Sequence, residues 1–218
     1  MIAAFILDPL QYPFMQQAMI GALISGIVCA VLSCYLILKG WALMGDAISH
    51  AVLPGIVISF MTGIPLVIGA FASGLLCAVA TGYFKANSRV KEDAILGVVF
   101  SGLFAIGIFL FSFTKTDQHL THVLFGNILG ILPEELLQIV IISGITLLIV
   151  LLKRKDFMLY CFDPVQAKVI GLPVKFLHYT LLILLALSIV ASIQAVGVIL
   201  VIAMLIAPGI IGFLLTKR

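Results

Sequence analysis

Long apolar runs alternate with short polar segments along most of the chain, and the polar segments hold nearly all of the charged residues. A helix that crosses the hydrocarbon core of a bilayer needs about 20 mostly apolar residues. Runs without Asp, Glu, Lys or Arg that have about this length, or about twice this length, cover residues 18–38, 47–84, 94–114, 136–152 and 179–216. The pattern therefore predicts membrane-spanning helices throughout the chain.

Two of these runs are long enough for a pair of spans each. The run 47–84 contains Gly-Ile-Pro at 63–65, and Gly and Pro together interrupt a helix. The run 179–216 contains the polar sequence Ser-Ile-Gln at 192–194, where we expect a second break. The run 136–152 is a little short, and can be extended through Pro133. The predicted fold is an all-α, polytopic bundle of about seven transmembrane helices.

The basic residues give this bundle an orientation, because cytoplasmic loops carry an excess of Lys and Arg. With the N-terminus outside, eleven of the twelve Lys and Arg residues fall on the inner side. Lys115 alone falls on the outer side. The asymmetry predicts an outer N-terminus and an inner C-terminus.

Composition leaves little room for a water-soluble protein. Hydrophobic residues make up 63% of the chain and charged residues 10%, against about 25% charged residues in a soluble domain. Lys and Arg are not clustered with interleaved aromatic residues, so nucleic acid is not an expected partner. The sequence has no phosphate-binding loop, no His-Glu-x-x-His and no Gly-x-Ser-x-Gly. We expect the lipid bilayer as its solvent, no enzyme activity and no bound cofactor.

Asp46 and His50 are the residues with the clearest potential for chemistry. They are four residues apart at the start of a span, and so share one face of a helix. A carboxylate oxygen and an imidazole nitrogen suit manganese, iron or zinc. Alternatively, Asp46 caps the helix and His50 packs against a neighbouring helix. One chain supplies two ligands here, and two copies would supply four.

Two segments outside the spans also attract attention. Residues 156–175, on the inner side, are longer than a hairpin turn requires, and we expect a short helix within them. Asp163 can cap this helix, Pro164 suits its first position, and Gly171 can end it. On the outer side His119 and His122 are weaker metal candidates, since exposed loop histidines are common. They lead into an apolar stretch at 124–130, which we expect to be a short helix at the outer rim.

Several linked motifs resemble one known family, and the resemblance covers nearly the whole chain from residue 18. The motifs are MGDAISHAVLPG at 44–55, SRVKED at 88–93, HVLFGNILG at 122–130, the segment from Phe162 through Pro173, and the segment 196–209. The sequence is similar to the membrane permease subunits of metal-type ABC importers, which take up manganese, iron or zinc.

The resemblance implies a single permease domain over 1–218 in a bacterial cell membrane. It implies a second permease copy or a paralogue, cytoplasmic ATPase subunits, and an extracellular or periplasmic metal-binding protein. Asp46 and His50 match the metal-coordinating pair of the family. The segment within 156–175 matches the cytoplasmic coupling helix, represented by Asp163, Pro164, Ala167, Gly171 and Pro173.

The chain departs from the family at its end. Family members usually continue for about another helical hairpin after the segment matching 207–209, so this sequence is expected to lack that hairpin. The form of the Asp46 motif, and the stretch from His119 to His122, look closer to the manganese and iron members than to the zinc members. Other interpretations are a zinc permease of the same family, a stand-alone metal channel or carrier, and a truncated, inactive subunit.

Overall fold

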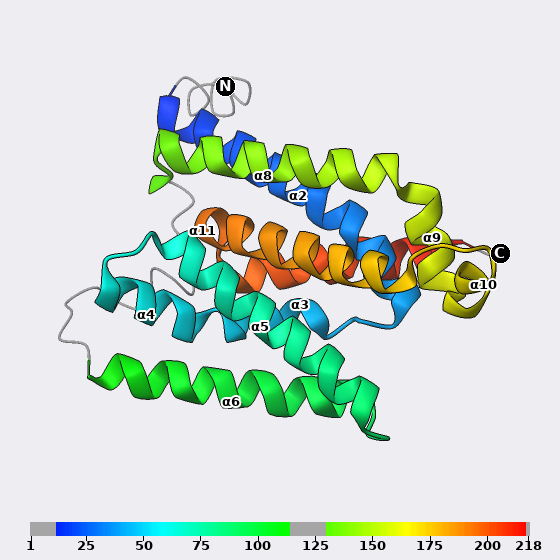
Figure 1. Ribbon diagram of the computed structural model, residues 1–218. Coiled ribbons are helices and arrows are strands. Elements are labelled where there is room, and N and C mark those ends of the chain that lie inside the picture. The colour runs from blue at the N-terminus through cyan, green and yellow to red at the C-terminus, as the bar shows by residue number, and fades with distance from the viewer. Residues whose placement is uncertain (1–11, 114–129, 217–218) are drawn as a thin grey trace.

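A computed structural model describes residues 12–113 and 130–216, and the regular structure in these ranges is helical, with no strands. The helices run roughly along one direction and form an elongated bundle (Figure 1). In chain order they are α2 (Pro13–Lys39), α3 (Met44–Ala51), α4 (Leu53–Thr62), α5 (Leu66–Asn87), α6 (Glu92–Ser112), α8 (Pro133–Leu152), α9 (Arg154–Phe162), α10 (Pro164–Val169) and α11 (Val174–Leu215).

The predicted number of spans is confirmed. Within the described ranges, seven helical segments are long and apolar enough to cross a membrane. α3 and α4 together make one of these, Met44–Thr62, while α11 contains two, Val174–Ile193 and Ala195–Leu215. The protein is therefore a multi-pass, all-α membrane protein.

The boundaries refine the sequence prediction at two points. The first span begins earlier than residue 18, because Pro13 occupies the first turn of α2, where its missing N–H costs nothing. The last run divides into two spans at residue 194, as expected, and the residue with a non-helical backbone is Gly197, three positions further along. Gly197 has φ 78° and ψ 168°, a backbone region open essentially to glycine alone. The ribbon reverses there, so the orange and red parts of α11 run in opposite directions (Figure 1).

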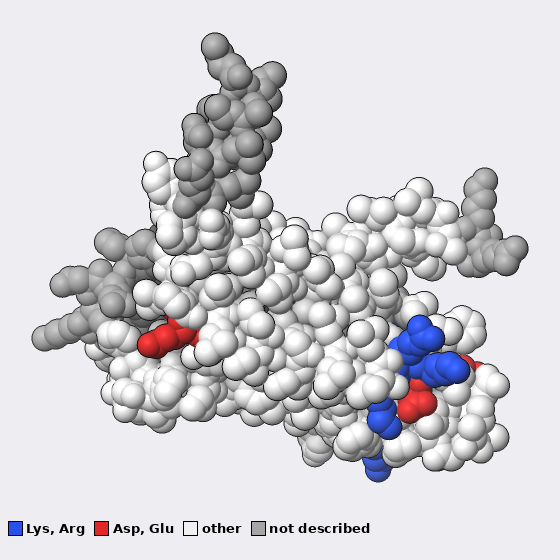
Figure 2. Space-filling model, turned by 90° about the horizontal axis from the view of Figure 1, so that it is seen from above, with Lys and Arg blue, Asp and Glu red and all other residues white. Residues whose placement is uncertain are grey.

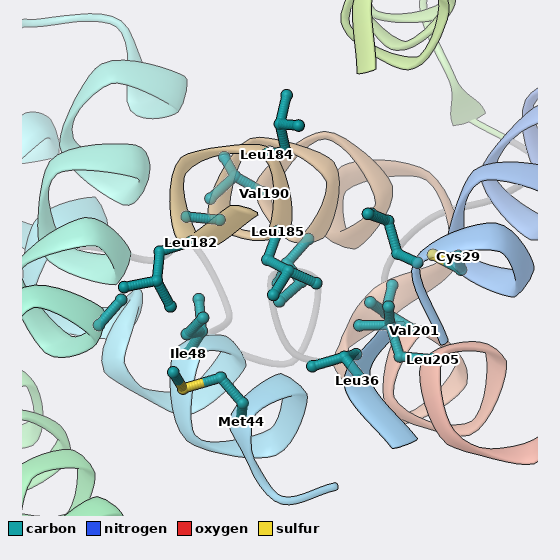
Figure 3. Packing of buried hydrophobic residues seen from close by; sticks show 14 of the residues in the cluster. Cys29, Leu36, Met44, Ile48, Leu182, Leu184, Leu185, Val190, Val201 and Leu205 are labelled. Carbon is teal, nitrogen blue, oxygen red and sulfur yellow. The ribbon is translucent and has the colours of Figure 1, made fainter. Parts of the chain in front are cut away.

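α11 lies at the centre of the bundle, between α2 and α8 on one side and α4, α5 and α6 on the other (Figure 1). It packs against α2, α3, α5 and α8. Buried apolar side chains fill the space between these helices (Figure 3). Ile48 of α3 and Leu185 of α11 are fully buried. The central position of α11 fixes where α3 lies.

α4 and α5 approach each other closely through two glycines. A Cβ atom on Gly55 would lie 2.0 Å from the carbonyl oxygen of Gly69, and one on Gly69 would lie 1.9 Å from the hydroxyl of Ser59. The Ser73 hydroxyl of α5 donates a hydrogen bond to the carbonyl of Ala51, at the end of α3. In a bilayer, small residues of this kind let helix backbones pack closely. The junction between α3 and α4 is thereby held against α5.

Basic residues gather at one end of the bundle. In Figure 2 the blue side chains lie toward the end that carries α9 and α10 in Figure 1. Lys39 ends α2, Lys85 lies in the last turn of α5, and Lys153 follows α8. The charge asymmetry in the sequence thus becomes a spatial asymmetry. The membrane orientation derived from it stays a prediction.

Candidate metal site and coupling segment

Asp46 and His50 lie one turn apart on α3, as their spacing predicts. The His50 Nε2 atom is 3.2 Å from the Asp46 Oδ1 atom. The Asp46 side chain is 35% exposed and the His50 side chain is 32% exposed. The opposite face of α3 is buried, with Ala47, Ile48 and Ala51 almost inaccessible. Burial of the apolar face directs the polar pair to the other side of α3, which lies near the middle of the bundle's length (Figure 1).

Helix capping does not explain Asp46. The N-cap residue of α3 is Leu43, and α3 has no side-chain hydrogen bond at its cap. Asp46 lies inside the first turn of α3, and its side chain contacts His50. The carboxylate therefore orients the imidazole. A carboxylate of this kind commonly fixes the ring orientation of a metal-binding histidine.

The His50 ring is also held by two aromatic residues of α6. Its centroid lies 6.1 Å from that of Phe100, in a stacked arrangement, and 5.5 Å from that of Phe104, edge to face. Its Nδ1 atom is buried and has no hydrogen-bond partner among the described residues. A buried nitrogen without a partner costs free energy. Packing alone therefore leaves one imidazole nitrogen unused.

His50 borders a small, mostly apolar cleft between α3, α4 and α11. Its lining includes Ser49, Leu53 and Ile56 from the first two helices, with Ile193 and Val198 from α11. The last two residues flank the backbone reversal at Gly197. The sequence did not associate α11 with the Asp46 motif. Nothing in the local pattern could have done so, because the two segments meet only through the fold.

The pair is an incomplete ligand set by itself. Among the described residues, no three His, Cys, Asp or Glu side chains are arranged to hold one metal ion. The four cysteines are free thiols, and Cys29, Cys77 and Cys161 are buried. Burial raises the pKa of the Cys161 thiol to about 11, so this thiol stays protonated at neutral pH. A metal ion held at Asp46 and His50 would need further ligands from water or from groups outside the residues that the structure describes.

The segment 156–175 contains the expected short helix. In α10 the Asp163 carboxylate accepts hydrogen bonds from the backbone N–H groups of Val165 and Gln166, at 2.9 and 3.0 Å. Pro164 opens α10, and Gly171 follows its end with φ 88°. The Leu172 N–H donates to the Ala167 carbonyl at 3.0 Å, which closes the C-terminal turn. The predicted helix and both of its ends are confirmed.

The structure adds α9, which the sequence pattern did not reveal. This helix precedes α10 directly, and the two lie together at the basic end of the bundle (Figure 1). Around them Phe162, Val165, Val169 and Ile170 are exposed by 79, 72, 81 and 62%. Ala167 is fully buried and seats α10, while Pro173 is the N-cap residue of α11. Exposed apolar residues around a helix capped for stability are typical of a contact surface for another protein.

The outer-side candidates His119 and His122 lie outside the described residues. So does nearly all of the predicted rim helix at 124–130. These interpretations stay predictions.

Comparison with known proteins decides the family. The sequence model of the ABC 3 transport family matches residues 11–218. The chain belongs to this family. It is a multi-pass membrane permease subunit of a transport system, and the resemblance drawn from its motifs is confirmed.

Individual relatives agree with this assignment. The "Chelated iron transport system membrane protein YfeD" of Yersinia pestis is 70% identical over 217 residues, which are 100% of the permease and 73% of that relative. The "Manganese transport system membrane protein MntB" of Synechocystis is 52% identical, over 98% of the permease and 70% of that relative. The solved structure of PsaBC from Streptococcus pneumoniae, in complex with a Fab, matches with a TM-score of 0.87 and 41% identity. This match covers 100% of the permease and 79% of that chain.

Proposed function

We propose that this permease conducts a divalent transition metal, manganese or iron, into the cell as part of an ATP-driven importer. Asp46 and His50 are the ligands in its translocation path. The observation that carries the proposal is the preformed pair on α3, in which the His50 Nε2 atom and the Asp46 Oδ1 atom lie 3.2 Å apart and present two donor atoms at one place. The names of the relatives support the choice of metals, since YfeD is named for chelated iron and MntB for manganese.

The ligand count argues for a second permease chain. A metal ion of this kind commonly takes four or more ligands, and the described residues of one chain offer two at this place. Two copies, or a copy and a paralogue, that meet at α3 would bring two carboxylates and two imidazoles together. The partial exposure of both side chains is consistent with a site that a neighbouring chain completes.

Energy would come from a separate ATPase. The sequence has no phosphate-binding loop, whereas α10 and its exposed apolar residues offer a contact surface at the basic end of the bundle. We therefore assign residues 163–173 as the element that couples ATP hydrolysis to transport. The basic end is then cytoplasmic, the N-terminus lies outside, and a metal-binding protein delivers the ion from outside.

Zinc is the second candidate ion, because oxygen and nitrogen ligands bind it as well, and selectivity depends on geometry and supply. A stand-alone channel or carrier is less well supported, since such a protein has no use for a capped cytoplasmic docking helix. Metal accumulation measured with manganese, iron and zinc in parallel separates the candidate ions.

The test of the site is the pair of substitutions Asp46→Ala and His50→Ala. Each should abolish metal accumulation in a strain without other importers, because each removes one of two ligands. Membrane levels should stay near those of the parent, since both side chains are partly exposed and the single polar contact between them contributes about 0.5–1.5 kcal/mol to stability. Asp156→Ala is the matched control, because Asp156 is similarly exposed and pairs with Lys153 at 3.5 Å. Variants that are well expressed and still accumulate metal at the parental rate would refute the assignment.

A further inference from the structure

A partly buried cluster of aromatic and basic side chains joins three parts of the permease near α10. We call Tyr160, His178, Lys39 and Trp41 the Tyr160 cluster. The Tyr160 hydroxyl lies 2.8 Å from His178 Nδ1, at hydrogen-bond distance. The Lys39 ammonium lies 4.1 Å from the centroid of the Tyr160 ring. The rings of Trp41 and His178 meet edge to face, at 5.3 Å. Tyr160 and Trp41 are each 2% exposed, so water hardly reaches them.

The cluster connects the docking helix with the helix that carries the metal pair. Tyr160 belongs to α9, and Asp163 is both the C-cap of α9 and the N-cap of α10. Trp41 lies in the linker between α2 and α3. The carbonyl of Trp41 accepts a hydrogen bond of 3.0 Å from the N–H of Met44, the first residue of α3. A displacement of α10 is therefore passed to α9 directly, and a displacement of Trp41 is passed to α3.

We infer that Tyr160 is a positioning residue, which transmits movement of α10 through His178 and Trp41 to α3, and so to Asp46 and His50. The inference rests on the proposed function, because it needs an ATPase at α10. It assigns to Tyr160 neither metal binding nor contact with ATP.

The chemistry of the contact distinguishes it from ordinary packing. Phe157, on the same helix, is also buried, and its ring packs against Tyr35 at a centroid distance of 6.0 Å. An apolar contact of that kind tolerates small shifts. The hydroxyl of Tyr160 and the imidazole of His178 form a part-buried hydrogen bond, whose strength depends on the distance and angle between the two groups. The pair is therefore restricted to one geometry, and α9 moves with α11.

The cation above the ring restricts this geometry further. A cation–π contact is favourable only while the ammonium of Lys39 stays over the face of the ring. Lys39 is the last residue of α2, directly before the linker that holds Trp41. Tyr160 thus holds the end of α2 through its ring and the start of α11 through its hydroxyl.

The test uses Tyr160→Phe, which removes the hydroxyl and keeps the ring for Lys39. The control is Tyr83→Phe, the same change at a tyrosine that is 65% exposed on α5. Each variant is purified with its ATPase and reconstituted in liposomes, where Mn²⁺ uptake and ATP hydrolysis are measured together. We expect unchanged assembly and basal hydrolysis for Tyr160→Phe. Uptake per ATP should fall about 3- to 10-fold, as expected for loss of one hydrogen bond.

Two further measurements isolate the connection itself. The double variant, which combines His178→Gln with Tyr160→Phe, should lose no more uptake per ATP than the stronger of the two single variants. Both substitutions break the same contact between residues 160 and 178. A cysteine at Leu43, which is 47% exposed in the linker, should change its rate of maleimide labelling when ATP and vanadate are added. This change should shrink in Tyr160→Phe and persist in Tyr83→Phe.

The labelling measurement needs no metal transport, so it judges the inference separately from the proposed function. A complex that shows the Leu43 response but takes up no metal refutes the metal assignment alone. If Tyr160→Phe has the parental uptake per ATP and the parental labelling response, Tyr160 does not transmit the movement. The same holds if the parent shows no labelling response, since no movement then reaches the linker. It also holds if the Tyr160→Phe complex fails to assemble, since the hydroxyl is then purely structural.

Discussion

Gly171 offers a quantitative test of the coupling segment. It has φ 88°, and a Cβ atom added there would meet nothing within 4 Å. The cost of a larger residue is thus backbone strain alone, with no steric clash. For a residue with a Cβ, the left-handed region costs roughly 1–2 kcal/mol. We expect Gly171→Ala near the lower value, and Gly171→Val at or above the upper one, since a β-branched residue fits this region worst.

These energies translate into a predicted loss of ATPase binding. If the strain distorts the turn after α10, the docked geometry becomes less populated, and 1–2 kcal/mol corresponds to about a 5- to 30-fold weaker affinity. Asn tolerates positive φ better than other residues with a Cβ, so Gly171→Asn should lie closest to the parent. Binding is measured by titrating the purified permease with its ATPase, and coupling by the stimulated hydrolysis.

The control for this series is Gly144→Ala. Gly144 lies within α8, and a Cβ atom there also meets nothing within 4 Å. The same added methyl group should leave ATPase binding unchanged. If Gly171→Val binds and stimulates the ATPase like the parent, the strain at Gly171 does not reach the interface. The assignment of 163–173 as the coupling element would then be wrong.

Two other predictions concern packing and orientation. Gly69→Ala should lower the stability of the purified permease by about 1–3 kcal/mol, because the added methyl group overpacks against α4. Gly144→Ala should leave the stability unchanged. Equal melting temperatures of the two variants would contradict the close contact between α4 and α5. A cysteine at Ser88, between α5 and α6, should be protected from impermeant thiol reagents in intact cells, and one at Ile64, between α4 and α5, should react; the reverse pattern would invert the topology.

Much of this protein could be predicted from local sequence, because a bilayer imposes a length and a composition on every span. The seven spans and the break at Gly63 are of this kind. The capped helix between Asp163 and Gly171 is another, since a cap depends on a few neighbouring residues. The shared helix face of Asp46 and His50 is also a local property, because it follows from their i, i+4 spacing.

The tertiary structure decided which surroundings these elements have. Helices of a membrane protein are apolar on most sides, so the pattern does not say which face meets which neighbour. The position of α11 beside His50, and the unpartnered Nδ1 atom of His50, follow from packing between distant segments. The backbone reversal at Gly197 could not be predicted from the sequence either, because the chain has nineteen glycines and most of them do not need a positive φ. The contact of Tyr160 with His178 joins two helices that no local signal links. Only the folded bundle brings these groups together.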